Sequence, residues 1–431
     1  MNPTFRAARG IGGEYTPPPD KSITHRALML ASIGSGTSTV VHPLATGDCV
    51  STRRCLEALG CSLEDTDCAV RVKGAGLRGF TEPKRLLDAE NSGTTTRLLS
   101  GLLAGLPLFA VLTGDQSLLG RPMARIVQPL RQMGARIEGR DEGRYAPLCF
   151  LPGSGELAPL SYRLPVPSAQ VKSCLLLAAL RAGGDSCISG KTHSRDHTER
   201  MLVALGVKVE SGPDGILLHP PRELPAFEAE VPGDPSSASF FIAASLISGR
   251  KLVVRRCSIN PSRNGFLNVV RRMGARVETR QETISLGEPA GSIEVKEGSL
   301  TGARIGAEEV PELIDEIPLL AVLGLFCRGV TEVRGAEELR FKESDRLTMI
   351  SRLVEGLGGR VEIFDDGFAL EGPQKLRAGV IDPSGDHRIA MAAAVAAAGI
   401  AEGVRVQGFE CAAVSYPDFA RDFAALGGEV V

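Results

Sequence analysis

Basic side chains lie at or near the polar starts of several strongly apolar segments of the sequence. The macrodipole of a helix disfavours cations in its first turn, so capping alone does not call for them. They nevertheless occur at equivalent places in a chain whose formal net charge is −2. They are Lys21, Arg26, Arg97, Lys172, His387 and Arg388. Because helix N–H groups and cations together bind phosphate and carboxylate well, the pattern predicts a site for a strongly anionic small molecule.

The same segments also have a purely structural interpretation. Ser, Thr, Asp and Asn are the usual residues at a helix start, so Ser168 and Asp315 could each be a cap. Glu343 and Asp345 could be first-turn acids of a following helix, and His387 could be a supporting polar residue. On these residues alone, a repeated binding scaffold without catalysis stays open.

Six segments are apolar nearly all round after a polar start, which predicts buried helices. They cover residues 21–33, 91–105, 167–180, 234–247, 314–326 and 385–400. Most precede a short run of β-branched and apolar residues, such as STVV or KLVVR, which predicts a strand. The fold class is therefore expected to be α/β, with these helices inside and the sheets outside.

A second pattern repeats along the chain. RQMGARIE at residues 131–138 returns as RRMGARVE at 271–278, and weaker copies occur elsewhere. The central glycines are Gly60, Gly134, Gly206, Gly274, Gly358 and Gly427, spaced 74, 72, 68, 84 and 69 residues apart. An amphipathic helix that ends at a glycine with positive φ, followed by an alternating strand, explains each copy. Internal repetition of this kind predicts six related units.

The ends of the chain suggest how the six units divide. The sixth unit stops at Val431 before a second hairpin strand, and TFRAARGIGGEY near the N-terminus can supply a strand. We therefore expect one domain of residues 19–232, with repeats one to three. The other combines residues 1–18 with 233–431, and the chain crosses between the two domains twice.

Composition narrows the class of protein. With 43% hydrophobic residues, the chain can bury two cores. The longest apolar run, IAMAAAVAAAGIA, is too short for a bilayer span, and no signal peptide is visible. Ten cysteines without C-x-x-C pairs indicate reduced, packing thiols and a cytoplasmic location. The net charge argues against a general nucleic-acid binder, and no membrane partner is expected.

Eight short motifs, in order, give the chain a resemblance to the 5-enolpyruvylshikimate-3-phosphate synthase family of enolpyruvyl transferases. They are DKSITHRAL, NSGTTTR, LTGDQSLLGRPM, VPSAQVKS, SRDHTE, IDEIP, RFKESDRL and GDHRIAM. The resemblance extends over all six units. It implies a two-domain inside-out α/β barrel with three repeats per domain, and an active site in a cleft that closes on substrates. It also implies enolpyruvyl transfer from phosphoenolpyruvate to the 5-hydroxyl of shikimate 3-phosphate, with release of phosphate.

The resemblance assigns binding residues to both anionic substrates. For shikimate 3-phosphate they are Lys21, Ser22, Arg26, Ser168, Ala169, Gln170, Arg195, Asp315 and Lys342. For phosphoenolpyruvate they are Lys21, Asn91, Gly93, Thr94, Arg121, Gln170, Glu343, Arg346, His387 and Arg388. Ser22 and Arg26 are expected on the carboxylate of shikimate 3-phosphate. Arginine suits such ligands because its planar fork meets carboxylate or phosphate bidentately.

The resemblance likewise implies the proton transfers. Asp315 matches the base near the 5-hydroxyl, Glu343 matches the carboxylate that acts on C3 of phosphoenolpyruvate, and Lys21 assists both. Carboxylates among cations favour their ionised form, which suits a base.

Three positions depart from the common family pattern. Val414 stands where many members have a phosphoenolpyruvate-binding lysine, Glu338 where asparagine is frequent, and Ala169 where serine is frequent. These features are similar to a second large subgroup of the family. The enolpyruvyl transferase that acts on UDP-N-acetylglucosamine stays an alternative, although GDQSLLGRPMAR lacks that enzyme's loop cysteine and KS replaces its KN.

A metal site is not expected. His193 and His197 have i, i+4 spacing, which suits a shared metal ion, but no third ligand is evident. We expect neither a metal nor another cofactor, and we expect a monomer.

Overall fold

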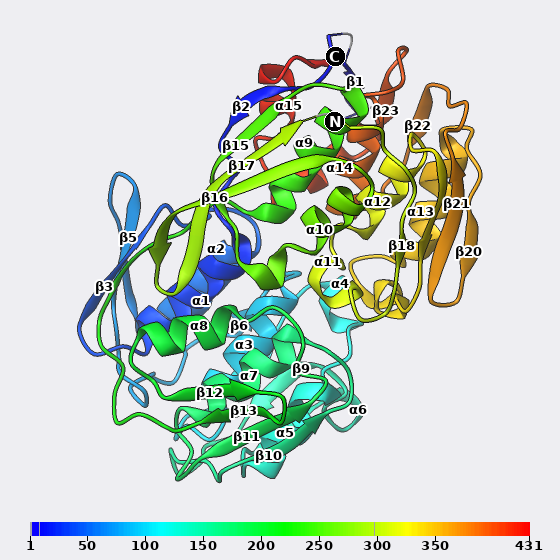
Figure 1. Ribbon diagram of the computed structural model, residues 1–431. Helices are drawn as coiled ribbons and strands as arrows, with labels where there is room; N and C mark the ends of the chain where they lie inside the picture. The colour runs from blue at the N-terminus through cyan, green and yellow to red at the C-terminus, as the bar shows by residue number, and fades with distance from the viewer. Residues whose placement is uncertain (1, 8, 297) are drawn as a thin grey trace. The chain divides into compact units, whose positions relative to one another are not determined.

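The computed structural model describes residues 2–7, 9–296 and 298–431 of the chain (Figure 1). The chain divides into two compact mixed α/β units. The N-terminal unit comprises Pro19–Val231 and Ile284–Glu288, and the C-terminal unit comprises Met1–Pro18, Pro232–Thr283 and Pro289–Val431.

The described part of the N-terminal unit holds three four-stranded sheets. Their strand orders are β14 (Glu228–Glu230), β3 (Thr37–Val41), β5 (Ala69–Lys73), β4 (Ser62–Asp65); β6 (Leu87–Asp88), β7 (Ala110–Thr113), β9 (Tyr145–Phe150), β8 (Ile137–Gly139); and β10 (Ser161–Leu164), β11 (Ser186–Gly190), β13 (Gly215–Leu218), β12 (Val209–Gly212). Buried and exposed residues alternate along strands such as β9, so one face of each sheet packs on a core.

Three more four-stranded sheets lie within the described residues of the C-terminal unit. Their orders are β2 (Gly13–Tyr15), β15 (Leu252–Ser258), β17 (Glu288–Lys296), β16 (Arg276–Ser285); β18 (Arg304–Ile305), β19 (Gly329–Val333), β21 (Gly367–Gly372), β20 (Glu362–Phe364); and β22 (Gly379–Ile381), β23 (Val404–Val406), β1 (Thr4–Arg6), β24 (Glu429–Val430). In the last sheet, β1 pairs antiparallel with both β23 and β24. The N-terminal stretch thus supplies a strand to the final sheet, as the sequence predicts.

One pairing plan recurs in every sheet of the described chain. An edge strand pairs in parallel with an inner strand, and that inner strand is antiparallel to the next one. The C-terminal unit repeats the plan. In four sheets the parallel partners are consecutive strands joined through a buried helix, as a parallel connection requires. In the other two, β14 with β3 and β2 with β15, the partners are distant in sequence.

The predicted apolar helices are confirmed as buried elements. They are α1 (Lys21–Ser32), α3 (Gly93–Leu103) and α7 (Ala169–Ala179) in the N-terminal unit, and α9 (Pro235–Ser248), α12 (Ile317–Gly324) and α14 (His387–Ala396) in the C-terminal unit. Every residue of α12 and α14 is buried. Each unit has its own hydrophobic core built around its three helices.

The remaining helices are shorter or amphipathic. They are α2 (Asp48–Ala58), α4 (Gln116–Leu119), α5 (Ala124–Gln132), α6 (Arg140–Gly143), α8 (His197–Ala204), α10 (Gly265–Arg272), α11 (Val310–Leu313), α13 (Arg346–Gly356) and α15 (Phe419–Ala425), with 3₁₀ turns η1 (Pro261–Arg263), η2 (Glu337–Phe341) and η3 (Phe409–Val414). All six repeated glycines have φ between 78° and 109°. This conformation is costly for residues with a Cβ, which explains why each copy keeps glycine there.

The tip of the β16–β17 hairpin differs from the sequence expectation. Residues 233–431 were expected in one domain, but Ile284–Glu288 group with the N-terminal unit. Leu286 packs against that unit's core, and the Ser285 hydroxyl accepts a hydrogen bond from the Glu230 N–H at 2.8 Å. The chain therefore passes between the units more often than the two times expected. The extra passages arise because the hairpin tip contacts residues that are far from it in sequence.

Candidate active site

The three buried helices of the N-terminal unit each begin with a side-chain cap. In α1 the Asp20 side chain accepts from the Ile23 N–H at 2.8 Å. In α3 the Ser92 hydroxyl accepts from the Thr95 N–H at 3.1 Å, and in α7 the Ser168 hydroxyl accepts from the Val171 N–H at 3.4 Å. None of these three helices has an acidic residue in its first turn. The caps of α3 and α7 are neutral, so these two helix starts keep a positive potential that suits an anion.

Side chains tie the starts of α3 and α7 together. The Gln170 Nε2 donates to the Thr94 Oγ1 at 3.0 Å, and the Gln170 Oε1 accepts a short hydrogen bond from the Arg97 Nη1. These two contacts fix the orientation of the amide. The amide oxygen of Gln170 accepts from Arg97, and one of its two amide N–H groups is used by Thr94. The second N–H can therefore be donated to a ligand oxygen.

Two guanidinium groups approach the backbone at the start of α3. A Cβ added to Gly93 would lie 3.0 Å from the Arg97 Nη1 and 3.3 Å from the Arg121 Nη1. Arg121 is buried and donates from Nη2 to the Ser117 Oγ at 3.1 Å, while its Nε has no hydrogen-bond partner among the described residues. A buried N–H in this state requires a partner, and an anion at the helix start would supply one.

Lys21 lies in the first turn of α1 and forms an ion pair with Asp48 of α2, with 3.0 Å between Nζ and Oδ2. The carbonyl of Asp48 accepts a hydrogen bond from the Thr95 hydroxyl at 3.4 Å. Lys21 is thereby held beside the first turns of both α1 and α3.

Arg26 lies one turn further along α1 and is buried. Its Nη1 donates to the Ser22 carbonyl at 2.9 Å, its Nε to the Thr198 Oγ1 at 2.8 Å, and its Nη2 to the Ser173 Oγ at 2.8 Å. Burial lowers the pKa of Arg26 to about 10, and the charge of Arg195 acts in the same direction. The guanidinium is still charged at neutral pH.

Lys172 differs from the sequence expectation of a cation available to an anionic ligand. Its Nζ lies 2.7 Å from the Glu199 carboxylate and donates to the carbonyls of Thr192 at 3.1 Å and Ser194 at 3.3 Å. This buried ammonium is neutralised and holds the loop that leads to Arg195. The position of Lys172 near a helix start could not reveal its partner, because the partner carboxylate, Glu199, follows 27 residues later in the sequence.

In the C-terminal unit, one buried arginine gathers three carboxylates. Arg346 donates from Nε to Asp386 at 2.9 Å, from Nη2 to Glu343 at 2.8 Å and from Nη1 to Asp315 at 3.3 Å. Burial opposes its charge, but the three carboxylates outweigh burial and raise the pKa of Arg346. Both predicted proton-transfer residues are therefore brought to one guanidinium.

Asp386 has two further tasks. It caps α14 by accepting the Arg388 N–H at 2.9 Å, and it accepts the Ser344 hydroxyl at 2.9 Å. Burial raises the pKa of its carboxyl, but the charges of Arg346 and His387 outweigh burial, and the net shift is downward.

The Asp386→Asn variant should lose about 3 kcal/mol of stability at neutral pH, because asparagine still caps a helix but leaves a buried arginine less neutralised. The folded-state pKa of Asp386 lies below its ordinary value of 3.8. Its contribution to stability is therefore present above pH 3.8 and is lost as pH falls through the folded value. Unfolding curves of wild type and variant should differ most at pH 7 and converge below about pH 4. Asp382→Asn, at an exposed position with a local turn contact, is the control. An Asp386→Asn deficit that stays unchanged at every pH below 3.8 would contradict the assignment.

Arg388 begins α14 and presents unused donors. It is 5% exposed, and its Nε and Nη1 have no hydrogen-bond partner among the described residues. Its guanidinium carbon lies 5.9 Å from the centre of the Phe240 ring, which supports the group without neutralising it. Of the described cations in this unit, Arg388 has the clearest need for an anion.

The other predicted residues of this unit lie in nearby segments of the chain. Lys342 follows η2 directly, Glu338 lies within η2, and His387 is the first residue of α14. Val414 ends η3, which packs on α14. The valine provides no charge there, so Arg388 is not joined by a lysine from that position.

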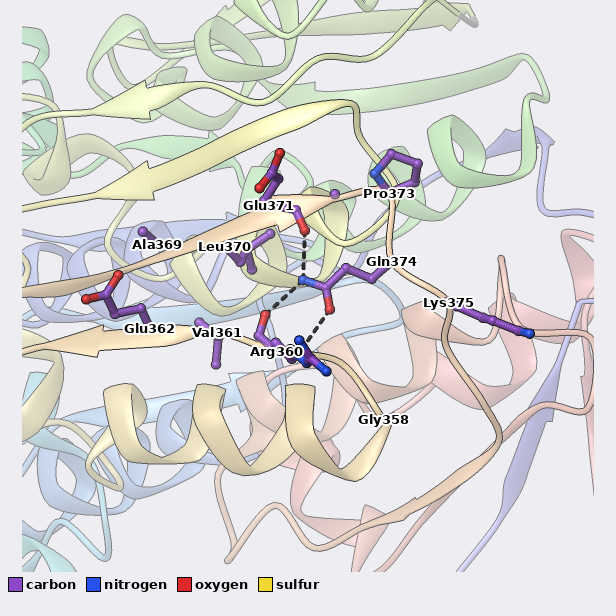
Figure 2. Close-up of a pocket in the computed structure, with 11 residues that line it drawn as sticks. Gly358, Arg360, Val361, Glu362, Ala369, Leu370, Glu371, Pro373, Gln374 and Lys375 are labelled. Atoms are coloured by element: carbon purple, nitrogen blue, oxygen red, sulfur yellow. Dashed lines mark hydrogen bonds between the residues drawn. The ribbon is translucent and has the colours of Figure 1, made fainter.

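A pocket of about 760 Å³ in the C-terminal unit lies apart from these residues (Figure 2). It is lined by Gly358, Arg360–Glu362 and Ala369–Lys375. Gln374 crosses it, accepting the Arg360 N–H at 2.7 Å and donating to the carbonyls of Arg360 and Glu371 at 2.8 Å each. Since its central polar group is satisfied within the protein, we assign the pocket no ligand.

Neither a metal cluster nor a membrane span is found in the described chain. No group of three or more His, Cys, Asp or Glu side chains there is arranged to hold a metal ion. His197, one of the histidines with metal-like spacing, is fully buried and pairs through Nδ1 with Glu288 at 2.8 Å. Among the same residues, no helix has the length and apolar character needed to cross a bilayer.

Comparison with known proteins identifies the family. The model of the EPSP synthase (3-phosphoshikimate 1-carboxyvinyltransferase) family matches residues 6–423. The chain belongs to the EPSP synthase family. The 3-phosphoshikimate 1-carboxyvinyltransferase of Bacillus cereus is 42% identical over 412 residues, covering 95% of each chain. That of Synechocystis sp. is 45% identical over 428 residues, covering 97% of this chain and 94% of the relative.

Solved structures agree with the family assignment. An EPSP synthase from Acinetobacter baumannii superposes with a TM-score of 0.88 at 36% identity, covering 100% of this chain and 99% of the other. An enolpyruvyl transferase from Streptomyces tendae shares the fold with a TM-score of 0.78 at 16% identity, covering 100% and 98%. The two-domain α/β fold is thus that of EPSP synthases. Family membership identifies the chain as a transferase of the shikimate pathway, and it favours this function over sugar-nucleotide transfer and over a non-catalytic scaffold.

Several residues that position the candidate site were not among the substrate-binding residues that the resemblance assigned, although Arg97 had been singled out as a cation at a helix start. Asp48, Arg97 and Asp386 each hold a predicted residue in place, and the hydroxyls of Ser173 and Thr198 hold Arg26. Arg97 and Asp386 lie inside quoted motifs, so the motifs themselves were a signal. Asp48 gave none, because it begins a helix that carries no other site residue.

Proposed function

We propose that the chain transfers the enolpyruvyl group of phosphoenolpyruvate to the 5-hydroxyl of shikimate 3-phosphate and releases phosphate. The observation that best supports this is the pair Arg121 and Arg388. Both are buried and have N–H groups with no partner among the described residues. Arg388 lies in the first turn of α14, and Arg121 approaches the start of α3 at Gly93. Each substrate carries a carboxylate and a phosphate, which are the groups such donors accept.

Binding of shikimate 3-phosphate is assigned mainly to the starts of α1 and α7. Arg26 and Ser22 bind the carboxylate, while Ser168, Ala169 and Gln170 bind the phosphate and ring side. Lys21, Arg195, Asp315 and Lys342 complete this set. Because Ala169 lacks a hydroxyl, its contribution comes from the backbone at the start of α7.

Binding of phosphoenolpyruvate is assigned to the start of α3 together with the C-terminal unit. Asn91, Gly93, Thr94, Gln170 and Arg121 come from the N-terminal unit. Arg346, His387, Arg388 and Glu343 come from the other, and Lys21 takes part in both sets. The proposed phosphoenolpyruvate set therefore draws residues from both units.

The chemistry is addition followed by elimination. Asp315 accepts the proton of the 5-hydroxyl while the hydroxyl oxygen attacks C2 of phosphoenolpyruvate. Glu343 donates a proton to C3 of phosphoenolpyruvate. In the tetrahedral intermediate, Glu343 removes a proton from C3 as the C2–O bond to phosphate breaks. Lys21 assists both steps. Assistance of this kind typically contributes 10²–10⁴-fold, and preorganised cations stabilise the departing phosphate.

The architecture and state of the enzyme are part of the proposal. Six sheets with one pairing plan support an inside-out barrel of six repeats, three in each domain, with boundaries near residues 18 and 232. The family resemblance favours a monomer in the cytoplasm that needs no metal or other cofactor.

Turnover with defined substrates tests the function. The purified chain should release phosphate when given shikimate 3-phosphate and phosphoenolpyruvate, and neither compound alone should suffice. UDP-N-acetylglucosamine in place of shikimate 3-phosphate should give no release. Release only with the sugar nucleotide would support the alternative transferase, and no release with either acceptor would support a scaffold.

A further inference from the structure

Arg26 is a buried cation held entirely by neutral groups. Its three donor contacts go to the Ser22 carbonyl, the Thr198 hydroxyl and the Ser173 hydroxyl. Within the described residues it forms no ion pair. Three other buried cations are paired instead: Lys172 with Glu199, Arg263 with Asp234 and Arg346 with three carboxylates. Glu199, Asp20 and Glu288 act on Arg26 only through space, without direct contact. A buried charge without a direct ion pair is costly, so Arg26 is a site that an anion completes.

The two hydroxyls form a closed ring with the guanidinium. Thr198 accepts from the Arg26 Nε and donates to the Ser173 Oγ at 2.7 Å, while Ser173 accepts from the Arg26 Nη2. Both hydroxyl-bearing residues are 1% exposed, so water does not compete for these contacts. The ring joins α1, α7 and α8, and it therefore braces one edge of the guanidinium against two other helices.

These contacts leave a defined part of Arg26 available. A guanidinium has five N–H groups, and three of them are used here. One N–H remains on each terminal nitrogen, and two such donors bind a carboxylate bidentately. A carboxylate side chain in place of either hydroxyl would neutralise Arg26. A hydroxyl orients the guanidinium and leaves its positive charge available to the substrate.

We propose that Ser173 and Thr198 are positioning residues that aim the remaining donors of Arg26 at the carboxylate of the cyclic acceptor substrate. This inference deepens the proposed function and rests on it. Neither hydroxyl contacts the substrate in this assignment. Loss of either hydroxyl should therefore weaken only the part of substrate binding that depends on the substrate's carboxylate.

The test uses Thr198→Val, which keeps the shape of the side chain and removes the hydroxyl. The KM for shikimate 3-phosphate should rise about 10- to 100-fold, the range for a lost hydrogen bond to a charged group. The KM for phosphoenolpyruvate and kcat should stay within about twofold, because the lost contact is not made to the reacting atoms. Thr198→Ser should restore the wild-type KM, and Ser173→Ala should act in the same direction as Thr198→Val.

A competitive inhibitor separates positioning from general damage. The probe is the analogue of shikimate 3-phosphate that lacks the carboxylate. It should bind the wild type and Thr198→Val with the same inhibition constant, since Arg26 has no partner on it. Ser100→Ala is the matched control, because Ser100 is a buried serine of the same unit whose hydroxyl only donates to the Thr96 carbonyl of its own helix at 2.7 Å.

Three outcomes would overturn the proposal. The first is an unchanged KM in Thr198→Val, the second is an equal loss for the analogue and the substrate, and the third is failure of Thr198→Ser to restore binding. If Thr198→Val does not fold, Ser173→Ala carries the same comparison of substrate with analogue. A wild type that does not turn over the two substrates would remove the proposed function instead, and calorimetric binding of shikimate 3-phosphate would still report on Arg26.

Discussion

Replacing Asp315 with alanine should lower kcat by about 10²- to 10⁴-fold, the range for loss of a positioned general base. Asp315 lies 3.3 Å from Arg346, at 18% side-chain exposure, so it contacts a buried cation and stays open to a substrate. Shikimate 3-phosphate should still bind in the micromolar-to-millimolar range, because the arginine and lysine contacts remain. Phosphate release under saturating substrates measures the effect.

Two companion variants identify the cause of the loss in Asp315→Ala. Asp315→Asn retains a hydrogen-bond acceptor for Arg346 but cannot accept the proton, so it should be nearly as slow. Glu362→Gln changes an exposed carboxylate on β20 of the same unit and should leave turnover unchanged. Wild-type turnover in Asp315→Ala would remove the base assignment, and full activity in Asp315→Asn would show that Asp315 only orients Arg346.

Replacing Arg388 with methionine should raise the KM for phosphoenolpyruvate about 100-fold, as expected when one partner of a buried charge pair is removed. The KM for shikimate 3-phosphate should change little. The melting temperature should stay the same or rise, because the buried Nε and Nη1 have no partners among the described residues in the absence of ligand. Steady-state kinetics with each substrate varied in turn, together with a thermal melt, measure both effects.

The Arg388→Met result has a charge-matched control. Arg405→Met removes an exposed arginine from β23 of the same unit and should alter neither KM. Arg388→Lys should recover only part of the affinity, since an ammonium cannot reproduce a bidentate fork. A large drop in melting temperature with an unchanged KM would show that Arg388 is a structural residue.

The elements of the fold were predictable because their causes are local. A long apolar run admits few structures other than a buried helix, as α12 and α14 show. A glycine after an amphipathic helix marks positive φ, and all six repeats have it. The strand contributed by the N-terminal stretch was also predictable, because the sixth unit visibly lacked one.

The partners of charged side chains were not predictable, because they come from distant parts of the chain. Arg346 meets Asp315 and Asp386, which lie 31 and 40 residues away on different elements. Lys172 is similar to Arg26 in sequence context, yet it forms an ion pair with Glu199, whereas Arg26 contacts two hydroxyls and a carbonyl. Resemblance to a family assigned residues to the substrates, but it gave no account of the groups that orient those residues. The hairpin tip at Ile284–Glu288 was missed for the same reason.

The insertion of β1 between β23 and β24 has a consequence for synthesis on the ribosome. Strand β1 at Thr4–Arg6 can find its neighbours only after β23 and β24, more than 390 residues later in the sequence, have emerged. At roughly 5–20 residues per second, this delay is about 20–90 s. During that interval the N-terminal segment must stay unpaired and available, while the intervening residues of the other unit are already complete. Slowing or blocking the exit of β23 and β24 should therefore leave a nascent chain whose N-terminal unit is ordered. Its C-terminal unit would still be exposed to chaperones and proteases.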